Sequence, residues 1–213
     1  LSQHFDFPDN AGQQRIATYL DSATTKIDRL MSLRRRQMEL LREQRTALLQ
    51  QAVTCGLTLR VPLKDSGVPW LGEIPKHWEV VRLGRLARLQ GGYAFDPKDF
   101  ADEGVPVVRM NNLKRGELDL SAPAKISPTQ TVARFALCEG DILFGMSGSV
   151  GETGSLGNFA FVTAKSLPLQ LNQRVGRFVI HNNKLSPDFL RLVVQSKLLA
   201  EQILLLVTGS AQF

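Results

Sequence analysis

Residues 64–83 read KDSGVPWLGEIPKHWEVVRL, directly after a long run of helical pattern and before a glycine-rich region with the composition of strands and turns. This order predicts a long helix that leads into a separate domain. Prolines and glycines restrict the backbone around Trp70 and Trp78, so we expect a fixed loop with both indoles packed down. Stacking on nucleic-acid bases is the alternative role for these rings.

Composition narrows the class of protein. The chain has 213 residues, 43% of them hydrophobic, and this is enough for one globular domain with an appended element. A formal net charge of +6 favours an acidic partner such as nucleic acid. Cys55 and Cys138 lie far apart without CxxC spacing, which argues against a zinc site or a disulfide framework and favours a reducing cytoplasm.

No apolar run reaches membrane-spanning length, and residues 1–10 lack the blocks of a signal peptide. A soluble cytoplasmic protein without membrane association is therefore expected. Because the chain starts at Leu1 and stops at Phe213, just after a Gly-Ser pair, we also expect a fragment or a processed chain.

The first helix is expected to begin at Asn10, with Gln13 reaching back in a capping box, and to stop at Gly56. It would run for roughly 45 residues, on the order of 65 Å. Its apolar positions follow a drifting stripe that is typical of a coiled coil and implies a partner helix. They are Ile16, Leu20, Ala23, Ile27, Leu30, Met31, Met38, Leu41, Leu48, Leu49 and Ala52.

Basic residues interrupt this stripe at Arg34 and Arg45, and Arg34, Arg35 and Arg36 form a continuous basic block. Most charge runs are solvated faces. The alternative is a spacer helix flanked by DNA or by acidic subunits.

The chain as a whole predicts an α+β fold. A long coiled-coil spacer helix, residues 1–58, is followed by a mixed, mostly β domain, residues 59–213, with a packed C-terminal helix. Strands are expected at 105–110, 141–146, 159–162 and 174–180. Ser186, Pro187 and Asp188 predict the start of the last helix, and Gly209 its end. Its apolar face would comprise Phe189, Leu190, Val193, Val194, Leu198, Ile203 and Leu204.

Glycines at 145, 148, 151 and 154 follow an apolar strand and invite comparison with a phosphate-binding loop. The required Gly-Lys-Ser/Thr is missing, because Glu152 and Thr153 follow Gly151. A tight turn that needs positive φ is the plain alternative.

Two polar clusters carry side chains suited to DNA. Arginine can bond guanine and asparagine adenine through paired contacts, while lysine and arginine meet phosphates. The first cluster follows the strand VPVV and comprises Arg109, Asn111, Asn112, Lys114 and Arg115; the second comprises Lys165, Gln170, Asn172, Gln173 and Arg174. The alternatives are a solvated turn for the first and amides that tie loops together for the second.

Catalytic chemistry finds no support. His4, His77 and His181 are scattered without metal-ligand spacing, and no Ser-His-Asp or paired-carboxylate pattern is present. An Asn-Pro-Pro-Tyr-type methyltransferase loop is also missing. The chain is therefore expected to bind and to direct chemistry done elsewhere, without a cofactor of its own.

Several motifs in order resemble the specificity subunits of type I restriction-modification systems. They are the helix 13–54, then Gly67, Trp70, Leu71, Gly72, Ile74, Pro75, Trp78 and Leu83, then DILFGMSGSVGETG at 141–154 and LNQRVGRF at 171–178. The match covers one spacer helix and one target-recognition domain of a family whose full members carry two of each.

This resemblance implies that the domain reads one half of a bipartite site in double-stranded DNA. The small polar loop Ser147, Gly148 and Ser149 would approach DNA, beside the clusters named above. Implied partners are methyltransferase subunits that use S-adenosylmethionine, restriction subunits that use ATP, and a second spacer helix in cis or by self-association.

Two other functions stay open: a coiled-coil protein-interaction module without DNA specificity, and, more remotely, an orphan nuclease or methyltransferase. Salt separates the first from DNA binding, since phosphate contacts weaken steeply with salt and an apolar interface hardly does.

Overall fold

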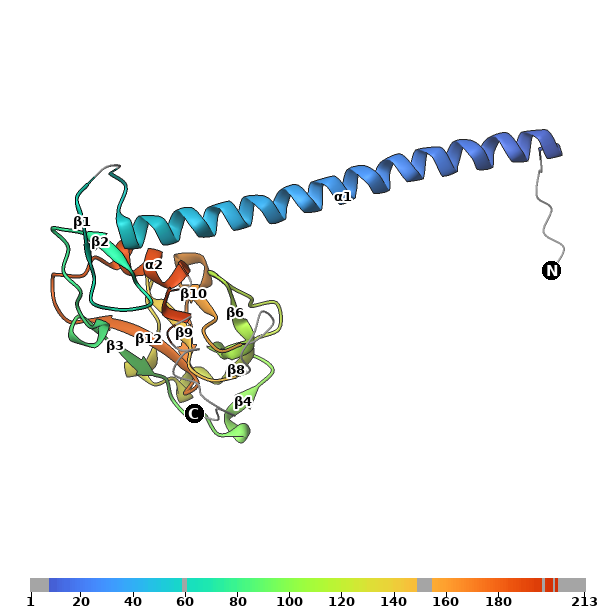
Figure 1. Ribbon diagram of the computed structural model, residues 1–213. Coiled ribbons are helices and arrows are strands. Elements are labelled where there is room, and N and C mark those ends of the chain that lie inside the picture. The colour runs from blue at the N-terminus through green and yellow to red at the C-terminus, as the bar shows by residue number, and fades with distance from the viewer. Residues whose placement is uncertain (1–7, 59–60, 149–154, 197, 201, 203–213) are drawn as a thin grey trace. The chain divides into compact units, whose positions relative to one another are not determined.

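The computed structural model describes residues 8–58, 61–148, 155–196, 198–200 and 202 (Figure 1). The chain divides into two compact units, Leu1–Arg45 and Thr46–Phe213. The first is helical and the second is a mostly β domain with a helix near its C-terminal end. This confirms the predicted α+β class.

Helix α1, Asn10–Cys55, has 46 residues and ends where Gly56 takes a positive φ of 80°, as predicted. Its first turn differs from the prediction. The cap is Asp9, whose carboxylate accepts from the Gly12 backbone N–H at 2.8 Å, and the Gln13 amide donates to the Pro8 carbonyl instead. The reason is charge, because a carboxylate satisfies the free N–H groups and opposes the positive end of the helix dipole.

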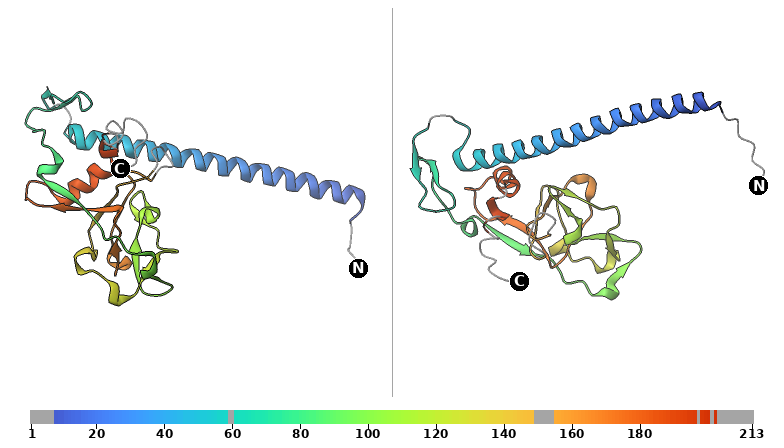
Figure 2. Two further views of the ribbon diagram at one scale, coloured as in Figure 1. Left: turned by 90° about the horizontal axis from the view of Figure 1, so that it is seen from below. Right: turned by 45° about the vertical axis from the view of Figure 1, so that its right-hand side comes forward.

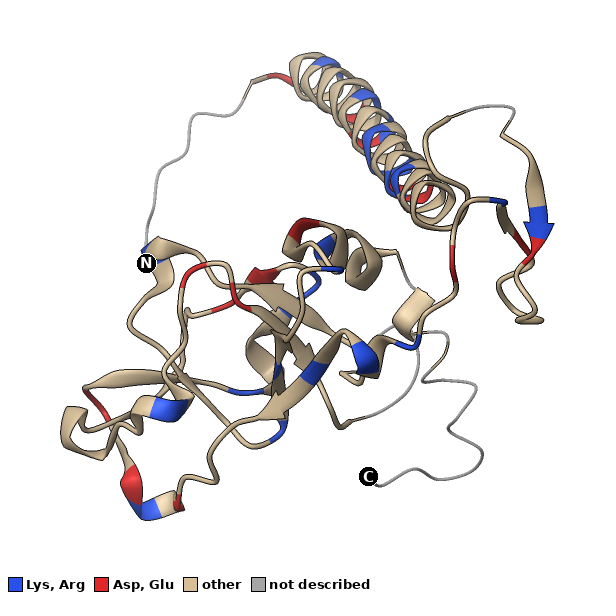
Figure 3. Cartoon of the chain, turned by 90° about the vertical axis from the view of Figure 1, so that its left-hand side faces the viewer, with Lys and Arg blue, Asp and Glu red and all other residues tan. Residues whose placement is uncertain are grey.

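Large apolar side chains stay exposed along α1, among them Ile16, Leu20, Ile27, Leu30 and Leu41. Both Lys/Arg and Asp/Glu occur along it (Figure 3). Arg34 bonds Gln37 at 2.8 Å, and Arg36 pairs with Glu39 at 3.1 Å on exposed surface. Such exposed pairs contribute little to stability, and all three arginines of the block are exposed.

The last turns of α1 belong to the second unit, since the contacts divide the chain between Arg45 and Thr46 rather than at the predicted 58/59. Val53 is 8% exposed there. Trp78 lies beside Gly56, where an added Cβ would stand 3.3 Å from its ring.

The segment that follows the long helix begins with a hairpin of β1, Leu63–Asp65, and β2, Glu73–Pro75. Asp65 and Ser66 side chains accept from the N–H groups of Gly67 and Val68 and close the turn. Trp78 is half-buried, but Trp70 is 45% exposed. The prediction that both indoles pack down is therefore wrong for Trp70, which sits in the turn between the strands rather than against a core.

The central antiparallel sheet has the order β10-β9-β12-β3. Its strands are β3 (Ala87–Gly91), β9 (Ile142–Gly145), β10 (Phe159–Phe161) and β12 (Val175–Ile180). Side chains alternate between two faces. Ile142 and Phe144 join the cluster that contains Leu190, whereas Leu143 and Val175 join the cluster that contains Val108.

The second sheet has the order β11-β5-β8-β4, with β11 parallel to β5 and the other pairs antiparallel. Its strands are β4 (Phe100–Ala101), β5 (Val105–Val108), β8 (Ala124–Ile126) and β11 (Gln170–Leu171). A small hairpin of β6 (Leu113–Lys114) and β7 (Glu117–Leu118) pairs with β10 through Gly116. Short 3-10 turns connect these strands: η1 (Leu83–Arg85), η2 (Pro97–Asp99), η3 (Met110–Asn112), η4 (Pro128–Gln130), η5 (Ala133–Phe135) and η6 (Ala164–Ser166).

The four predicted strands correspond to β5, β9, β10 and β12, each trimmed at its ends. Helix α2, Pro187–Gln195, starts where predicted and lies beside the central sheet (Figure 2). It buries Leu190 and Val194 in a cluster with Phe178 and Ile180 of that sheet. It stops at Ser196, whose N–H and hydroxyl both bond the Val193 carbonyl. The predicted Ile203, Leu204 and Gly209 lie outside the described residues.

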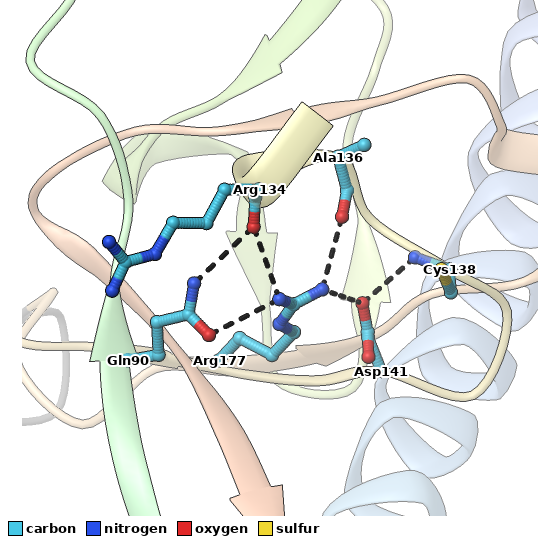
Figure 4. A network of polar contacts seen from close by, with 6 residues as sticks. All are labelled: Gln90, Arg134, Ala136, Cys138, Asp141 and Arg177. Carbon is cyan, nitrogen blue, oxygen red and sulfur yellow. Dashed lines mark hydrogen bonds and ion pairs between the residues drawn. The ribbon is translucent and has the colours of Figure 1, made fainter. Parts of the chain in front are cut away.

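A partly buried ion pair connects the central sheet to the loop before β9 (Figure 4). Arg177 on β12 lies 3.2 Å from Asp141, and their side chains are 16% and 18% exposed. Arg177 also donates to the Ala136 carbonyl at 3.0 Å and to the Gln90 amide oxygen at 3.3 Å. Asp141 accepts from the Cys138 N–H at 2.8 Å. A charge this enclosed stabilises the fold only while its partner is present.

Asp141→Ala should therefore lower the free energy of unfolding of the full chain by about 3 kcal/mol, because it leaves the Arg177 guanidinium without its partner. Glu139→Ala is the matched control, since this carboxylate lies exposed in the same loop. Urea unfolding followed by circular dichroism makes the comparison. Equal midpoints for the two variants would show that the pair does not hold the sheet.

The end of α1 gives a second prediction. A chain that begins at residue 46 should unfold at the same urea concentration as the β-rich domain of the full chain, whereas one that begins at 59 should unfold earlier. Losing the burial of Val53 alone should lower the free energy of unfolding by about 1–2 kcal/mol. If both truncated chains unfold alike, the last turns of α1 do not support the domain.

Candidate nucleic-acid interface

One edge of the domain gathers strand ends from both sheets. Gly91 at the end of β3 faces Gly176, and Gly145 at the end of β9 faces Val175 at the start of β12. In the other sheet, Leu171 of β11 lies beside Val108 at the end of β5. The segments that leave these strands therefore meet. We call the surface formed by Tyr93, Arg109, Asn111, Ser147, Gly148, Asn172, Gln173 and Arg174 the strand-end surface.

The turn Asn172–Arg174 organises this surface. The Asn172 N–H donates to the Val108 carbonyl at 3.1 Å, and the Gln173 N–H donates to the Tyr93 carbonyl at 3.0 Å. The Met146 N–H donates to the Arg174 carbonyl at 3.1 Å. Backbone bonds thus tie one turn to the ends of β3, β5 and β9, which leaves the exposed side chains of Gln173 and Arg174 facing solvent.

Arg109 follows β5 directly and is half-buried. Its guanidinium carbon lies 5.7 Å from the centre of the Phe100 ring, within cation–π range. Its Nε is buried and has no hydrogen-bond partner among the described residues, and no ion pair in that part of the chain involves it. Burying part of a guanidinium without a hydrogen-bond partner costs free energy, unless a ligand supplies the partner.

Asn112 has a structural role. It is 3% exposed, its side-chain oxygen accepts from the Arg109 N–H at 2.8 Å, and its amide donates to the Asp119 carbonyl at 2.9 Å. These bonds use the groups that would read adenine, so the geometry opposes the predicted base contact. The same burial applies to Gln170, whose side-chain oxygen accepts from the Val132 N–H at 3.0 Å. Gln170 therefore fits the loop-tying alternative of the second cluster, whereas Asn112 is too buried for the solvated turn that was the alternative for the first.

The rest of the first cluster lies in two places. Asn111 is exposed in η3 beside Arg109. Lys114 and Arg115 are exposed in the β6–β7 hairpin, where Arg115 and Gly116 take φ values of 47° and 116° in a two-residue turn. The Gly116 N–H donates to the Phe159 carbonyl at 2.8 Å, so this hairpin borders β10 rather than the turn at 172–174.

Asp119 stands close to this hairpin. Hydrogen bonds from the Ser121 hydroxyl and N–H lower the pKa of the Asp119 carboxyl from its ordinary value, and the charge of Lys114 adds to this effect. Asp119 is therefore ionised at neutral pH.

Ser147 and Gly148 leave β9 at the strand-end surface. Gly148 has a φ of 123°, and a side chain at this position would collide with Ser155. The predicted Ser149 lies outside the described residues. Lys165 is exposed in η6, after β10, where the Val162 N–H donates to the Asp141 carbonyl at the start of β9. Lys165 therefore lies at the opposite end of the central sheet from the others.

Tyr93 belongs to neither predicted cluster, yet it is 43% exposed at this surface and bonded through its backbone to Leu171 and Gln173. The signal for it was the preceding glycine pair. A Cβ at Gly92 would overlap the backbone of Leu171 in β11. Only glycine therefore allows the chain to pass β11 after the end of β3.

Within the described ranges, His, Cys, Asp and Glu side chains form no group of three or more suited to a metal ion. No helix in the described part of the chain has a stretch both long and apolar enough to cross a bilayer.

Comparison with known families assigns the domain. The model of the type I restriction modification DNA specificity domain matches residues 75–212. The chain belongs to this family. The match begins at the end of β2, in the β1–β2 hairpin, and includes every residue of the strand-end surface.

Relatives agree with this assignment. The type I restriction enzyme MjaVIII specificity subunit of Methanocaldococcus jannaschii is 25% identical over 203 residues, which is 94% of this chain and 45% of the relative. The Escherichia coli EcoAI specificity subunit is 30% identical over 138 residues, 63% of this chain and 23% of the relative. The chain thus spans less than half the length of these curated relatives.

Among solved structures, the HsdS subunit from Thermoanaerobacter tengcongensis aligns with a TM-score of 0.47 at 17% identity, over 87% of this chain and 40% of that one.

The bonds of Asn112 lead to a prediction about this loop. Asn112→Ala should lower the free energy of unfolding by about 2 kcal/mol, because it leaves the Arg109 N–H and the Asp119 carbonyl without their partner. Asn111→Ala, at the exposed neighbour, should leave stability unchanged. Thermal or urea unfolding of both variants tests this, and an Asn112→Ala protein as stable as the wild type would return this residue to the set of DNA contacts.

Proposed function

We propose that this chain selects a DNA sequence as a specificity component of a type I restriction-modification complex. In this role it performs no catalysis and directs methyltransferase and restriction subunits to a site in double-stranded DNA. Membership of the specificity-domain family and the names of its relatives support this proposal.

The observation that carries the proposal is Arg109. Its guanidinium is half-buried on Phe100 at the strand-end surface and has no ion pair or side-chain hydrogen bond to any described residue. Paired acceptors on the guanine edge satisfy two arginine N–H groups at once and supply the missing partner.

Neighbouring side chains extend this chemistry. Gln173 can bond adenine in the same paired manner, and Arg174 can reach guanine or a phosphate. Asn111, Asn172, Ser147 and Gly148 complete the proposed reading surface. Ser149, which lies outside the described residues, is proposed as a DNA contact with them. Lys114 and Arg115, on the hairpin, are proposed to contact phosphates. Lys165 lies at the other end of the sheet, so it would meet DNA outside the site read by the others.

Helix α1 is proposed as the spacer. Its exposed apolar side chains require a partner helix, supplied either by another part of a complete subunit or by a second copy. Those same side chains support the alternative of a protein-interaction module. The two roles separate by experiment, because only the DNA-reading role makes binding depend on base sequence and steeply on salt.

The test is selection from a duplex library with a randomised centre, using the full chain alone and together with its modification subunit. Arg109→Ala should lose about 1–3 kcal/mol of discrimination between the selected duplex and a scrambled one. Lys114→Ala should weaken binding to every duplex alike and reduce the slope of log affinity against log salt by about one.

Arg88→Ala is the matched control, since this exposed arginine lies on β3 beside Val179, away from the strand-end surface. It should keep full discrimination. If Arg109→Ala also keeps full discrimination, the reading residues lie elsewhere. If the wild-type chain selects no sequence in either form, the proposed function fails.

A further inference from the structure

We propose that Tyr93 and Arg134 form a phosphate-contacting pair that sets the position of the strand-end surface along the DNA backbone. This inference rests on the proposed function. It assigns a role to two residues that stand outside both polar clusters of the sequence, and it starts from the contacts that hold Tyr93 in place.

The backbone of Tyr93 is held on both sides. Its N–H donates to the Leu171 carbonyl at 2.9 Å, and its carbonyl accepts from the Gln173 N–H at 3.0 Å. The preceding residue, Gly92, lies so close to the Leu171 backbone that no side chain fits. Tyr93 is therefore fixed next to the turn that carries Gln173 and Arg174.

The side chain of Tyr93 is held as well. Its ring meets Phe95 edge-on, with centres 5.0 Å apart, and Phe135 at a tilt, with centres 5.8 Å apart. Phe95 is buried with Val107 and Ile126, so this contact joins Tyr93 to the core of the second sheet. A ring already ordered by its neighbours loses little entropy when it binds.

The Tyr93 hydroxyl and the Arg134 guanidinium have no polar partner among the described residues. Tyr93 is 43% exposed, and its hydroxyl makes no hydrogen bond to a described residue. Arg134, also exposed, places its guanidinium carbon 5.7 Å from the centre of the Phe135 ring, the same ring that Tyr93 contacts. In the described part of the chain, no ion pair involves Arg134.

A neutral hydroxyl donor and a guanidinium whose side chains both contact the Phe135 ring suit the phosphate backbone, and such contacts position a protein without reading sequence. Stacking on a base fits less well, because Phe95 and Phe135 already cover part of the Tyr93 ring. The glycine at 92 and the aromatic contacts are then explained together, as the means of presenting one hydroxyl at a fixed point.

Tyr93→Phe keeps the ring packing and removes only the hydroxyl. It should weaken binding of the full chain to the selected and the scrambled duplex alike, by about tenfold, the effect of one hydrogen bond to a charged group. The salt slope should not change, since no cation is lost. Arg134→Ala should also weaken binding to both duplexes, but it should reduce that slope by about one.

Tyr19→Phe is the matched control, because Tyr19 and Tyr93 are the two tyrosines of the chain and the same hydroxyl is removed from α1. It should bind like the wild type. In that variant Tyr93 is the single tyrosine, so a ¹³Cζ label reports on its hydroxyl, and the signal should shift when the selected duplex is added.

Three results would overturn the inference: unchanged affinity of Tyr93→Phe, loss of discrimination rather than of affinity, or a label that does not respond to DNA. Each is distinguishable from failure of the proposed function, since in all three the wild-type chain still selects its sequence. An Arg134→Ala variant with an unaltered salt slope would remove Arg134 from the pair.

Discussion

The turn from β11 into β12 is the constraint on which the domain depends, because there the chain passes from one sheet to the other. β11 runs parallel to β5 and β12 antiparallel to β9, so a single turn, Asn172–Arg174, adjoins the ends of both. Three backbone hydrogen bonds, to Val108, Tyr93 and Met146, fix it in place. The strand-end surface is thus positioned by main-chain geometry, and side chains on it are free to serve another purpose.

The arginines show how the chain separates structure from recognition. Arg177 lies inside the fold, with its charge matched by Asp141 and its N–H groups directed at Ala136, Arg134 and Gln90 (Figure 4). Arg109 is half-buried, yet the described residues offer it only the Phe100 ring. Enclosing a charge costs free energy in both cases. At Arg177 the ion pair and the hydrogen bonds of the terminal nitrogens offset this cost, although its Nε, like that of Arg109, has no partner among the described residues. At Arg109 the proposed contact with guanine would offset it.

Much of the fold could be predicted from the sequence, because its signals are local. A helical period that stops at Gly56 and apolar runs bounded by turns place α1, β5, β9, β10 and β12. Strands of two or three residues, such as β8 and β11, leave no period to detect. The capping of α1 was displaced by one residue, since Asp9 and Asn10 are both able to cap.

The candidate site was predictable by residue type but not by role. Arg109 and Asn112 stand three residues apart in one loop, yet one lacks a partner and the other is buried with both amide groups bonded. Only the fold of η3 and β6–β7 decides between them. Lys165 was grouped with Asn172 by nearness in sequence, although the path through η6 and β11 places them at opposite ends of the central sheet. The sequence did not predict Tyr93, because its place at this surface depends on contacts with Phe135, Leu171 and Gln173, which lie far along the chain.

The central claim is that the strand-end surface is the DNA interface, and amide hydrogen exchange with and without the selected duplex tests it most directly. Slower exchange on DNA binding is expected in peptides that cover 109–111, 146–148 and 172–174, with no change at η6 or in the β1–β2 hairpin. Protection confined to η6, or to the hairpin that carries the exposed Trp70, would contradict the account.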